Sequence, residues 1–204
     1  MIFLAGPHAA GKTLFANKLR QYNFAIIDLG PTLRQVHKTN SGSSSSFGEW
    51  IAAGEQQCGR HFTDEILAEE IKAFLNVAHK HALIDVVIVG SRSLSGIRYI
   101  EGKLHATSDG KKSVIIFLDA PTELLYERYQ RREQQQMTLP AFKELLAEDE
   151  KLGINTIRRE ADYHIVNDGD ELALQHKIQQ FVATVLGDEG DTSENRMLYR
   201  TDQN

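Results

Sequence analysis

The sequence is poor in the features that mark secreted proteins and membrane proteins. Its 204 residues include one cysteine, Cys58, so an intrachain disulfide is excluded and a reducing compartment is favoured. No apolar run approaches the length that spans a bilayer. The first predicted strand begins at Met1, which leaves no room for a signal peptide. We therefore expect a cytoplasmic protein that has no membrane partner.

An excess of positive charge is also missing. Lysine and arginine number 23 against 28 aspartates and glutamates, which gives a formal net charge of −5 at pH 7. Proteins that bind nucleic acid usually show the opposite balance, with basic and aromatic residues interleaved. We therefore expect no nucleic-acid partner. The length and the hydrophobic share of 41% are sufficient for one α/β domain with a sizeable core.

What the sequence does contain is a glycine-rich loop close to its start. Residues 6–13 read Gly-Pro-His-Ala-Ala-Gly-Lys-Thr and match the pattern GxxxxGK[ST]. An apolar run at 1–5 precedes the loop, and residues 14–19 have the spacing of a helix with one inner face. This order of strand, loop and helix is the context in which the pattern binds nucleoside triphosphates. The alternative is an ordinary glycine-rich turn; with both flanking elements in place, we favour nucleotide binding.

The residue types of this loop match the needs of a phosphate chain. Glycines let successive backbone N–H groups point inward, and the helix that begins near Gly11 adds the positive end of its dipole. Lys12 would reach the β- and γ-phosphates, and the Thr13 hydroxyl would be a ligand of Mg²⁺. The predicted cofactors are therefore ATP and Mg²⁺. The cofactor-binding residues predicted here are Gly6, Pro7, His8, Ala9, Ala10, Gly11, Lys12, Thr13 and Leu14.

Buried strands alternate with helices along the whole chain. This pattern predicts an α/β fold, a P-loop NTPase-type three-layer α/β/α arrangement with a parallel five-stranded sheet. Ligands of such sheets bind beyond the carboxyl ends of the strands. We predict one domain over 1–186, with an acceptor-binding insertion at about 30–80 and a lid at about 126–150, and a disordered polar tail over 187–204. The predicted strands are 1–5, 24–28, 84–90, 114–119 and 163–166.

Helix signals fall between these strands. Thr63 is the predicted cap of a long helix, and Asp170 is the predicted cap of the last one. The serine-rich run 40–46 predicts a mobile loop. The predicted helices are 30–36, 47–57, 63–78, 94–106, 120–132, 138–151 and 171–186, with a turn at 108–111 and a polar stretch at 133–136.

Three charged residues lie at the end of the second predicted strand or shortly after the second and third strands. Arg92 lies in the loop after the third strand, and Arg34 lies one helix turn beyond the second. Arg92 would face the γ-phosphate or the phosphate of an acceptor, where its planar fork can bind two oxygens, and Arg34 is a similar candidate. An exposed surface role is the alternative for both. Asp28 ends the second strand and would orient the acceptor oxygen or accept its proton.

Arg128 and Arg132 lie four residues apart, on one face of a predicted helix. In a phosphotransferase, arginines on a mobile segment close over the phosphates and neutralise charge during transfer. Arg131 lies off this face and is expected to be solvated. On spacing alone, a charged amphipathic helix without a catalytic role remains the alternative.

These segments together resemble a known family, the nucleotide-kinase-like P-loop kinases. Within it they are most similar to the dephospho-CoA kinase and adenylate-kinase-related branch, in which Asn167, Asp168 and Gly169 resemble the loop beside the adenine. The resemblance implies a fold like that of nucleoside monophosphate kinases, with a mobile lid and acceptor-binding helices. The segments that carry it are 6–13, 87–93, 117–121 followed by Arg128 and Arg132, 151–154 and 161–169.

One position departs from the family pattern. Relatives in this branch usually have Asp-Gly at the end of the central strand, whereas Val89 precedes Gly90 here. The missing aspartate helps to hold Mg²⁺, often through water. Asp28 and Asp119 end neighbouring strands and would partly replace it, while Asp85 sits at the wrong end of its strand. The departure motivates an alternative function, a nucleotide-binding sensor or interaction protein without turnover.

The residues together predict a small-molecule kinase. It would transfer the γ-phosphoryl group of ATP to a small acceptor, such as a nucleoside monophosphate or a dephospho-CoA-like molecule. This chemistry requires mainly positioning and charge neutralisation. A nucleic-acid end kinase is disfavoured by the acidic balance. The predicted catalytic residues are Lys12, Asp28, Arg92, Arg128 and Arg132, and the predicted acceptor-binding residues are Asp28, Arg34 and Arg92.

Overall fold

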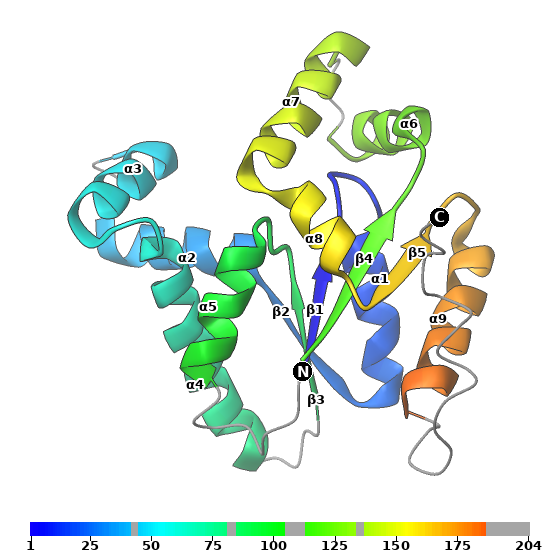
Figure 1. Cartoon of the computed structure of the whole chain (residues 1–204), viewed down its shortest axis with the longest axis horizontal. Helices are drawn as coiled ribbons and strands as arrows, with labels where there is room; N and C mark the ends of the chain where they lie inside the picture. Colours follow the sequence, from blue (N-terminus) through cyan, green and yellow to red (C-terminus); the bar gives the residue numbers. More distant parts are fainter. Residues whose placement is uncertain (42–44, 81–84, 105–112, 134–136, 187–204) are drawn as a thin grey trace.

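One parallel sheet forms the centre of the molecule (Figure 1). The computed structural model describes residues 1–41, 45–80, 85–104, 113–133 and 137–186. Within them, five parallel strands pair in the order β2-β3-β1-β4-β5, which confirms the predicted fold class. Because all five run in the same direction, their carboxyl ends meet at one edge of the sheet. The strands are β1 (Ile2–Ala5), β2 (Phe24–Asp28), β3 (Asp85–Val89), β4 (Val114–Asp119) and β5 (Tyr163–Val166).

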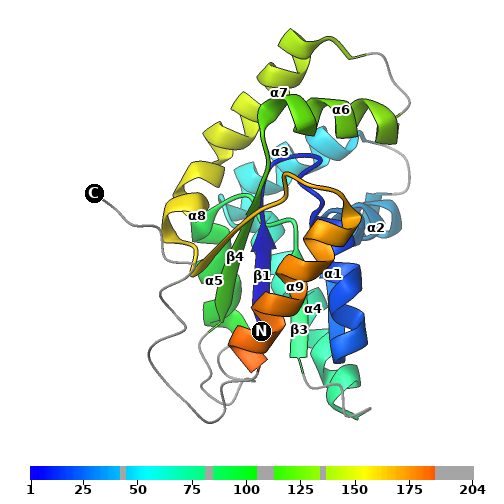
Figure 2. The ribbon, with the colours of Figure 1, turned by 90° about the vertical axis from the view of Figure 1, so that its right-hand side faces the viewer.

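Helices cover both faces of this sheet (Figure 2). One face packs against α1 and α9, and the other packs against α4, α5 and α8. Four further helices, α2, α3, α6 and α7, lie around the carboxyl edge of the strands (Figure 1). The helices are α1 (Lys12–Leu19), the 3₁₀ turn η1 (Arg20–Tyr22), α2 (Leu29–Ser41), α3 (Phe47–Cys58), α4 (Phe62–Lys80), α5 (Leu94–Leu104), α6 (Thr122–Glu133), α7 (Leu139–Leu152), α8 (Ile154–Glu160) and α9 (Glu171–Leu186).

The central strand β1 supplies side chains to both layers of the core. Successive residues of a strand point to opposite faces. Ile2 and Leu4 accordingly pack with α1 and α9, whereas Phe3 and Ala5 pack with α4 and α5. All four are buried. Burial on both faces explains why the strands are nearly continuous apolar runs, and it fixes the end of β1 against its neighbours.

Two helices begin earlier than the sequence predicts. α2 starts at Leu29, immediately after β2, and continues to Ser41, so Asn40 and Ser41 are helical and not part of a loop. α4 starts at Phe62, so Thr63 lies in its first turn and is not its cap. In both cases the apolar residue before the predicted start is drawn into the helix because it packs in or against the core.

The carboxyl-terminal part of the domain contains one confirmed cap and one helix that was not predicted. Asp170 caps α9, because its Oδ1 accepts the backbone N–H of Ala173 at 2.8 Å. The additional helix is α8, which follows Gly153. This glycine has a φ of 107°, a left-handed conformation that ends α7 and lets the chain turn into Ile154.

Some sequence predictions lie outside the described residues. They are the serine run at 42–44, the turn at 108–111, the polar residues 134–136 and the tail at 187–204. Among the described helices, none has both the length and the apolar character needed to cross a membrane.

Gly48 and Gly54 provide a test of how α3 packs on α4. A Cβ on Gly54 would lie 2.1 Å from Cε1 of Phe62, whereas a Cβ on Gly48 would meet no atom within 4 Å. Overpacking costs about 1–3 kcal/mol, and alanine gains up to about 1 kcal/mol over glycine inside a helix. We expect Gly54→Ala to lower the free energy of unfolding and Gly48→Ala to maintain or raise it, as measured by urea titration. Equal stabilities for the two variants would contradict this packing.

Candidate active site

The glycine-rich loop joins β1 to α1 at the carboxyl edge of the sheet, and two of its glycines are required by its geometry. Gly6 has a φ of 147°, and a Cβ there would lie 2.1 Å from the carbonyl oxygen of Leu118 on β4. Gly11 has a φ of 93° and precedes α1, and a Cβ there would lie 2.6 Å from Nδ2 of Asn167. A side chain at either position would displace neighbouring strands or loops. The loop path therefore depends on both glycines.

Lys12 folds back over this loop. Its Nζ donates hydrogen bonds to the carbonyl oxygens of Gly6 and Pro7, both at 2.7 Å. Burial lowers the pKa of Lys12 to about 8, although the carboxylate of Asp149 opposes that shift. A phosphate placed here would favour the charged ammonium, because an adjacent anion raises the pKa of a lysine. The lysine is therefore arranged to respond to a negative ligand.

A cavity of about 700 Å³ opens above the loop and the start of α1. Six of the nine predicted cofactor-binding residues at 6–14 line it, whereas Gly6, Pro7 and Ala10 are buried beneath it. Arg131 is exposed, as the sequence predicts, and it also lines the cavity beside Arg128 and Arg132. The lining residues are His8, Ala9, Gly11, Lys12, Thr13, Leu14, Leu124, Glu127, Arg128, Arg131, Arg132, Asn167, Gly169, Asp170, Glu171 and Leu174.

Arg128 connects α6 to the loop that follows β5. Its Nη1 and Nη2 donate to the carbonyl oxygens of Asn167 and Gly169, at 2.8 and 2.9 Å. The buried amide of Asn167 in turn donates to the carbonyl oxygen of Ala10 at 2.9 Å. Burial also lowers the pKa of Arg128. Arg128 thus holds one wall of the cavity in place by backbone hydrogen bonds, a function the sequence analysis did not predict.

Asp168 and Arg132 occupy different surroundings within the same region. Asp168 does not line the cavity; its carboxylate pairs with Lys177 at 2.8 Å, which lowers its pKa. Arg132 is exposed, lines the cavity and lies over the ring of Tyr129 at 5.6 Å. Of the predicted adenine-loop residues, Asn167 and Gly169 therefore face the cavity, and Asp168 turns toward α9.

A second cavity, of about 510 Å³, lies beyond the ends of β2 and β3. Arg34 and Arg92 both line it, as does Arg60, a residue that the sequence analysis did not single out. Its walls also include apolar side chains from α2 and α3, among them Leu33, Phe47 and Ile51. The combination of three guanidinium groups and apolar walls fits a small anionic molecule.

Asp28 lies at the strand end next to the one that lacks an aspartate. In the pairing of β2 with β3, Asp28 lies directly opposite Val89. One carboxylate oxygen, Oδ1, accepts the backbone N–H of Gly30 at 3.2 Å and would be 3.8 Å from a Cβ on Gly90. The negative charge of Asp28 also raises the pKa of Lys12. Asp28 lines neither cavity, but it lies close to Gly90 at the edge of the smaller one and acts electrostatically on Lys12 of the loop.

Asp119 does not occupy an equivalent place, so its expected substitution for the missing aspartate is wrong. Its Oδ1 accepts the backbone N–H of Ala120 at 2.9 Å, and its Oδ2 accepts from Nη2 of Arg158 at 2.7 Å. Arg158 belongs to α8, the helix that the sequence did not predict. The ion pair binds one carboxylate oxygen to α8, and the backbone N–H of Ala120 binds the other.

The sequence analysis also missed Asp149, a buried carboxylate of α7 with an exposed fraction of 3%. Its Oδ1 lies 3.2 Å from Nη1 of Arg92, and its Oδ2 lies 3.5 Å from Nε2 of His8. Burial lowers the pKa of His8, so this imidazole is neutral at pH 7 and Arg92 is the ionic partner. Asp149 thus links the predicted lid to the glycine-rich loop. No local pattern marks it, because it lies within an ordinary amphipathic helix.

The residues present fit Mg²⁺ only together with a phosphate ligand. Among the described residues, no group of three or more His, Cys, Asp or Glu side chains could hold a metal. Thr13 is exposed and lines the larger cavity, at the first turn of α1. Magnesium commonly takes one or two protein oxygens and completes its shell with water and substrate phosphates. Thr13 supplies such an oxygen.

Comparisons with known proteins show the fold. No family model matches the chain. Among curated proteins, the UPF0200 protein of Thermococcus onnurineus is 22% identical over 192 residues, covering 92% of this chain and 99% of its own length. That of Thermococcus gammatolerans is 21% identical over 190 residues, covering 91% and 95%.

Solved structures share this fold, and two of them are kinase or resistance proteins by name. Shikimate kinase from Acinetobacter baumannii, solved with shikimate, is 18% identical with a TM-score of 0.55, covering 93% of this chain and 94% of that one. The tunicamycin resistance protein of Deinococcus radiodurans is 19% identical with a TM-score of 0.57, covering 90% and 94%. The chain has a P-loop kinase-like fold. The comparisons do not support the dephospho-CoA kinase branch that the sequence resembles.

The lowered pKa of Lys12 gives a direct test of the site's electrostatics. We expect the Lys12 ammonium to titrate near pH 8 in the free protein. Asp149→Asn should lower that pKa further, because it removes the charge that opposes burial. The measurement is a pH titration by NMR of protein labelled with ¹³C at lysine Cε, with Lys12→Arg used to assign the resonance. A wild-type midpoint above about pH 10, the range of a solvated lysine, would contradict the burial of this group.

Proposed function

We propose that the protein is an ATP-dependent small-molecule kinase that transfers the γ-phosphoryl group to a small anionic acceptor. The observation that carries the proposal is the pair of neighbouring cavities at the carboxyl edge of the sheet. One contains the glycine-rich loop with Lys12 and Thr13, and the other contains Arg34, Arg60 and Arg92. Arg92 approaches His8 of the loop to 3.3 Å, so the two cavities adjoin.

The larger cavity has the residues that a triphosphate needs. Bound ATP with Mg²⁺ would supply the transferable phosphoryl group and part of the charge neutralisation. The amino-terminal end of α1 directs its backbone N–H groups toward such an anion. Lys12 would exchange its hydrogen bonds to the loop carbonyls for phosphate oxygens, and Thr13 would hold the metal. Arg132 and Arg131 would neutralise charge from the side of α6.

The smaller cavity has the residues that an acceptor needs. Arg34 and Arg92 would hold its anionic group, and Asp28 would orient the acceptor oxygen or accept its proton. A nucleoside monophosphate and a dephospho-CoA-like molecule both belong to this class. Shikimate, which one of the fold neighbours binds, is a carboxylate of the same class without a nucleotide. The volume of about 510 Å³ supports a small molecule rather than a polymer.

A nucleotide-binding sensor without turnover is the second candidate, and Val89 favours it. The strand end that commonly carries the metal-associated aspartate has an apolar, buried residue here. Asp119 is committed to Arg158, so Asp28 is the carboxylate left beside that position. The two functions differ in one measurable property, namely whether ADP is produced with any acceptor in a panel of nucleoside monophosphates, nucleosides, dephospho-CoA and shikimate.

Lys12→Ala tests the phosphoryl-transfer role of the loop. We expect acceptor-dependent ADP production to fall about a hundredfold or more, because a charged donor to the transferred group is removed. Lys18→Ala is the matched control, since Lys18 belongs to the same helix and pairs with Glu171 at 2.7 Å. It should retain activity. Near-native transfer by Lys12→Ala, in a variant that unfolds at the same temperature as wild type, would exclude the kinase function.

Asp28→Asn distinguishes the active kinase from the sensor. We expect kcat to fall about a hundredfold, the usual scale of general acid–base and positioning effects. The KM for ATP should change less than about twofold, because Asp28 would act on the acceptor or the metal. Asp119→Asn is the control, since it removes a strand-end carboxylate that pairs with Arg158. If wild type binds ATP and turns over no acceptor of the panel, the sensor is the better description.

A further inference from the structure

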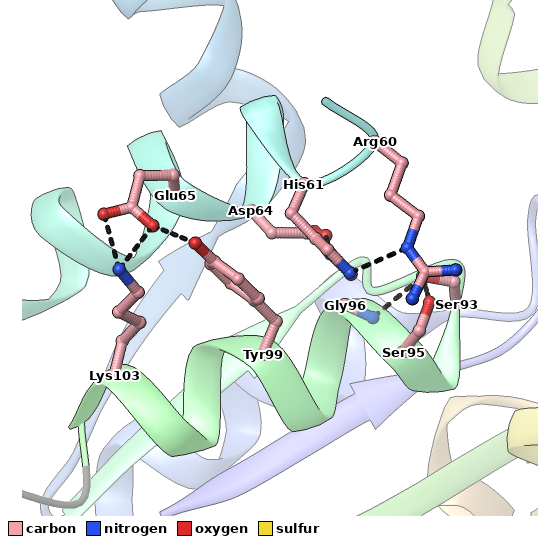
Figure 3. A network of polar contacts seen from close by, with 9 residues as sticks. All are labelled: Arg60, His61, Asp64, Glu65, Ser93, Ser95, Gly96, Tyr99 and Lys103. Carbon is pink, nitrogen blue, oxygen red and sulfur yellow. Dashed lines mark hydrogen bonds and ion pairs between the residues drawn. The ribbon is translucent and has the colours of Figure 1, made fainter. Parts of the chain in front are cut away.

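Arg60 enters the smaller cavity from the short connection between α3 and α4. It follows Gly59, whose φ of 89° lets the chain turn sharply at the end of α3. Its side chain lines the cavity opposite the start of α5, where Ser93 and Ser95 also belong to the lining (Figure 3). An arginine on such a connection would have many rotamers unless another group held it.

His61 is the group that holds Arg60. The Nε of Arg60 donates to Nε2 of His61 at 3.1 Å, and Nδ1 of His61 lies 2.8 Å from Oδ2 of Asp64 (Figure 3). A guanidinium has only donors, so Nε2 must be the acceptor and the ring proton must be on Nδ1. The Nδ1–H group therefore donates its hydrogen bond to Oδ2 of Asp64. The three side chains thus form a chain that requires the neutral imidazole with a single tautomer.

The surroundings fix the ring of His61 in this orientation. It stacks on Tyr99 of α5, with ring centroids 4.4 Å apart and planes inclined by 8°. The hydroxyl of Tyr99 donates to Glu65, which also pairs with Lys103 at 2.8 Å (Figure 3). These contacts join α4 to α5 on the side away from the glycine-rich loop. The imidazole is therefore held at its face by Tyr99 and at both nitrogens by hydrogen bonds.

Asp64 is held as well. A Cβ on Gly96 would lie 2.7 Å from its Oδ1, so only a glycine at that position of α5 leaves room for the carboxylate. Gly96 also donates its backbone N–H to Ser93 Oγ at 3.1 Å, within the same cavity wall. The chain from Asp64 through His61 to Arg60 consequently rests on two helices that are packed together.

We propose that His61 is a positioning residue for acceptor binding. By accepting from Nε, the imidazole sets the direction of the Arg60 side chain and leaves its two terminal nitrogens for a carboxylate or phosphate in the cavity. This inference rests on the proposed function, because it identifies an anion as the group that the smaller cavity recognises. It makes Arg60 a specificity-determining residue beside Arg34 and Arg92, and it makes His61 act only through Arg60.

The experiment measures anion binding directly and does not require turnover. The probe is inorganic phosphate, titrated into protein labelled with ¹⁵N at arginine and saturated with ADP so that the glycine-rich loop is occupied. The Nε–H resonance of Arg60 is assigned from its loss in Arg60→Ala. Arg98, which pairs with Glu101 at 2.8 Å and does not line the cavity, is the internal control that should not respond.

We expect His61→Leu to raise the Kd for phosphate about five- to tenfold, the usual net scale of one lost hydrogen bond. His61→Gln should restore binding to within about twofold, because its amide oxygen can accept from Arg60 near the position of Nε2. The double variant with Arg60→Ala should bind no more weakly than Arg60→Ala alone. Circular dichroism and unfolding temperature confirm that each variant is folded.

Three results would overturn the proposal. They are an Arg60 resonance of wild type that phosphate does not shift, phosphate binding by His61→Leu as tight as that of wild type, and additive effects of His61→Leu and Arg60→Ala on the Kd. The first result would exclude the anion subsite, and the second would exclude its dependence on His61. The third would assign His61 a structural role that does not act through Arg60. Failure of ADP production with phosphate binding intact would contradict the kinase function instead, so the two proposals can fail separately.

Discussion

The whole site depends on the close approach of Gly6 to β4. The carbonyl oxygen of Leu118 lies where a Cβ of residue 6 would be, so the chain leaves β1 along a path that any side chain would block. That path turns the loop over the sheet edge and starts α1 at Lys12. Asn167 then fixes the far side of the loop through Ala10. The positions of β1, β4 and β5 thus determine where a phosphate group could lie against the loop.

The charges around the loop are mainly positive, with one buried carboxylate among them. Lys12, Arg92 and Arg132 all lie close enough to influence the pKa of His8, and Asp149 is the buried carboxylate among them. Buried charges are costly unless they are paired. The α7 carboxylate of Asp149 reduces that cost by pairing with Arg92. A residue of the predicted lid therefore contributes to the electrostatics of the glycine-rich loop.

The sheet was predictable because each strand carries its own signal. Apolar runs buried on both faces gave four strand ends correctly, and these ends brought Asp28 beside Val89. The glycine-rich loop was recognisable from its spacing alone. The cap at Asp170 was also local, since it depends on residues within one turn of α9.

What the sequence could not predict are contacts between distant residues. Asp149 meets His8, and Arg92 meets the same histidine from another loop, so no window of sequence contains the arrangement. Arg60 and His61 are adjacent in the sequence, yet the orientation of the imidazole depends on the ring of Tyr99, which belongs to α5. Arg128 was noticed for its charge, but the carbonyls it binds belong to the loop after β5. Fold placement, rather than residue type, decides each of these roles.

Arg92 has a further consequence because it is shared. It lines the smaller cavity, and it also touches His8 at the wall of the larger one. A ligand that draws this guanidinium toward one cavity changes the free energy of binding in the other. Thermodynamic linkage requires that effect to be reciprocal. Arg92 is thus a side chain through which ligands of the two cavities would affect each other's affinity.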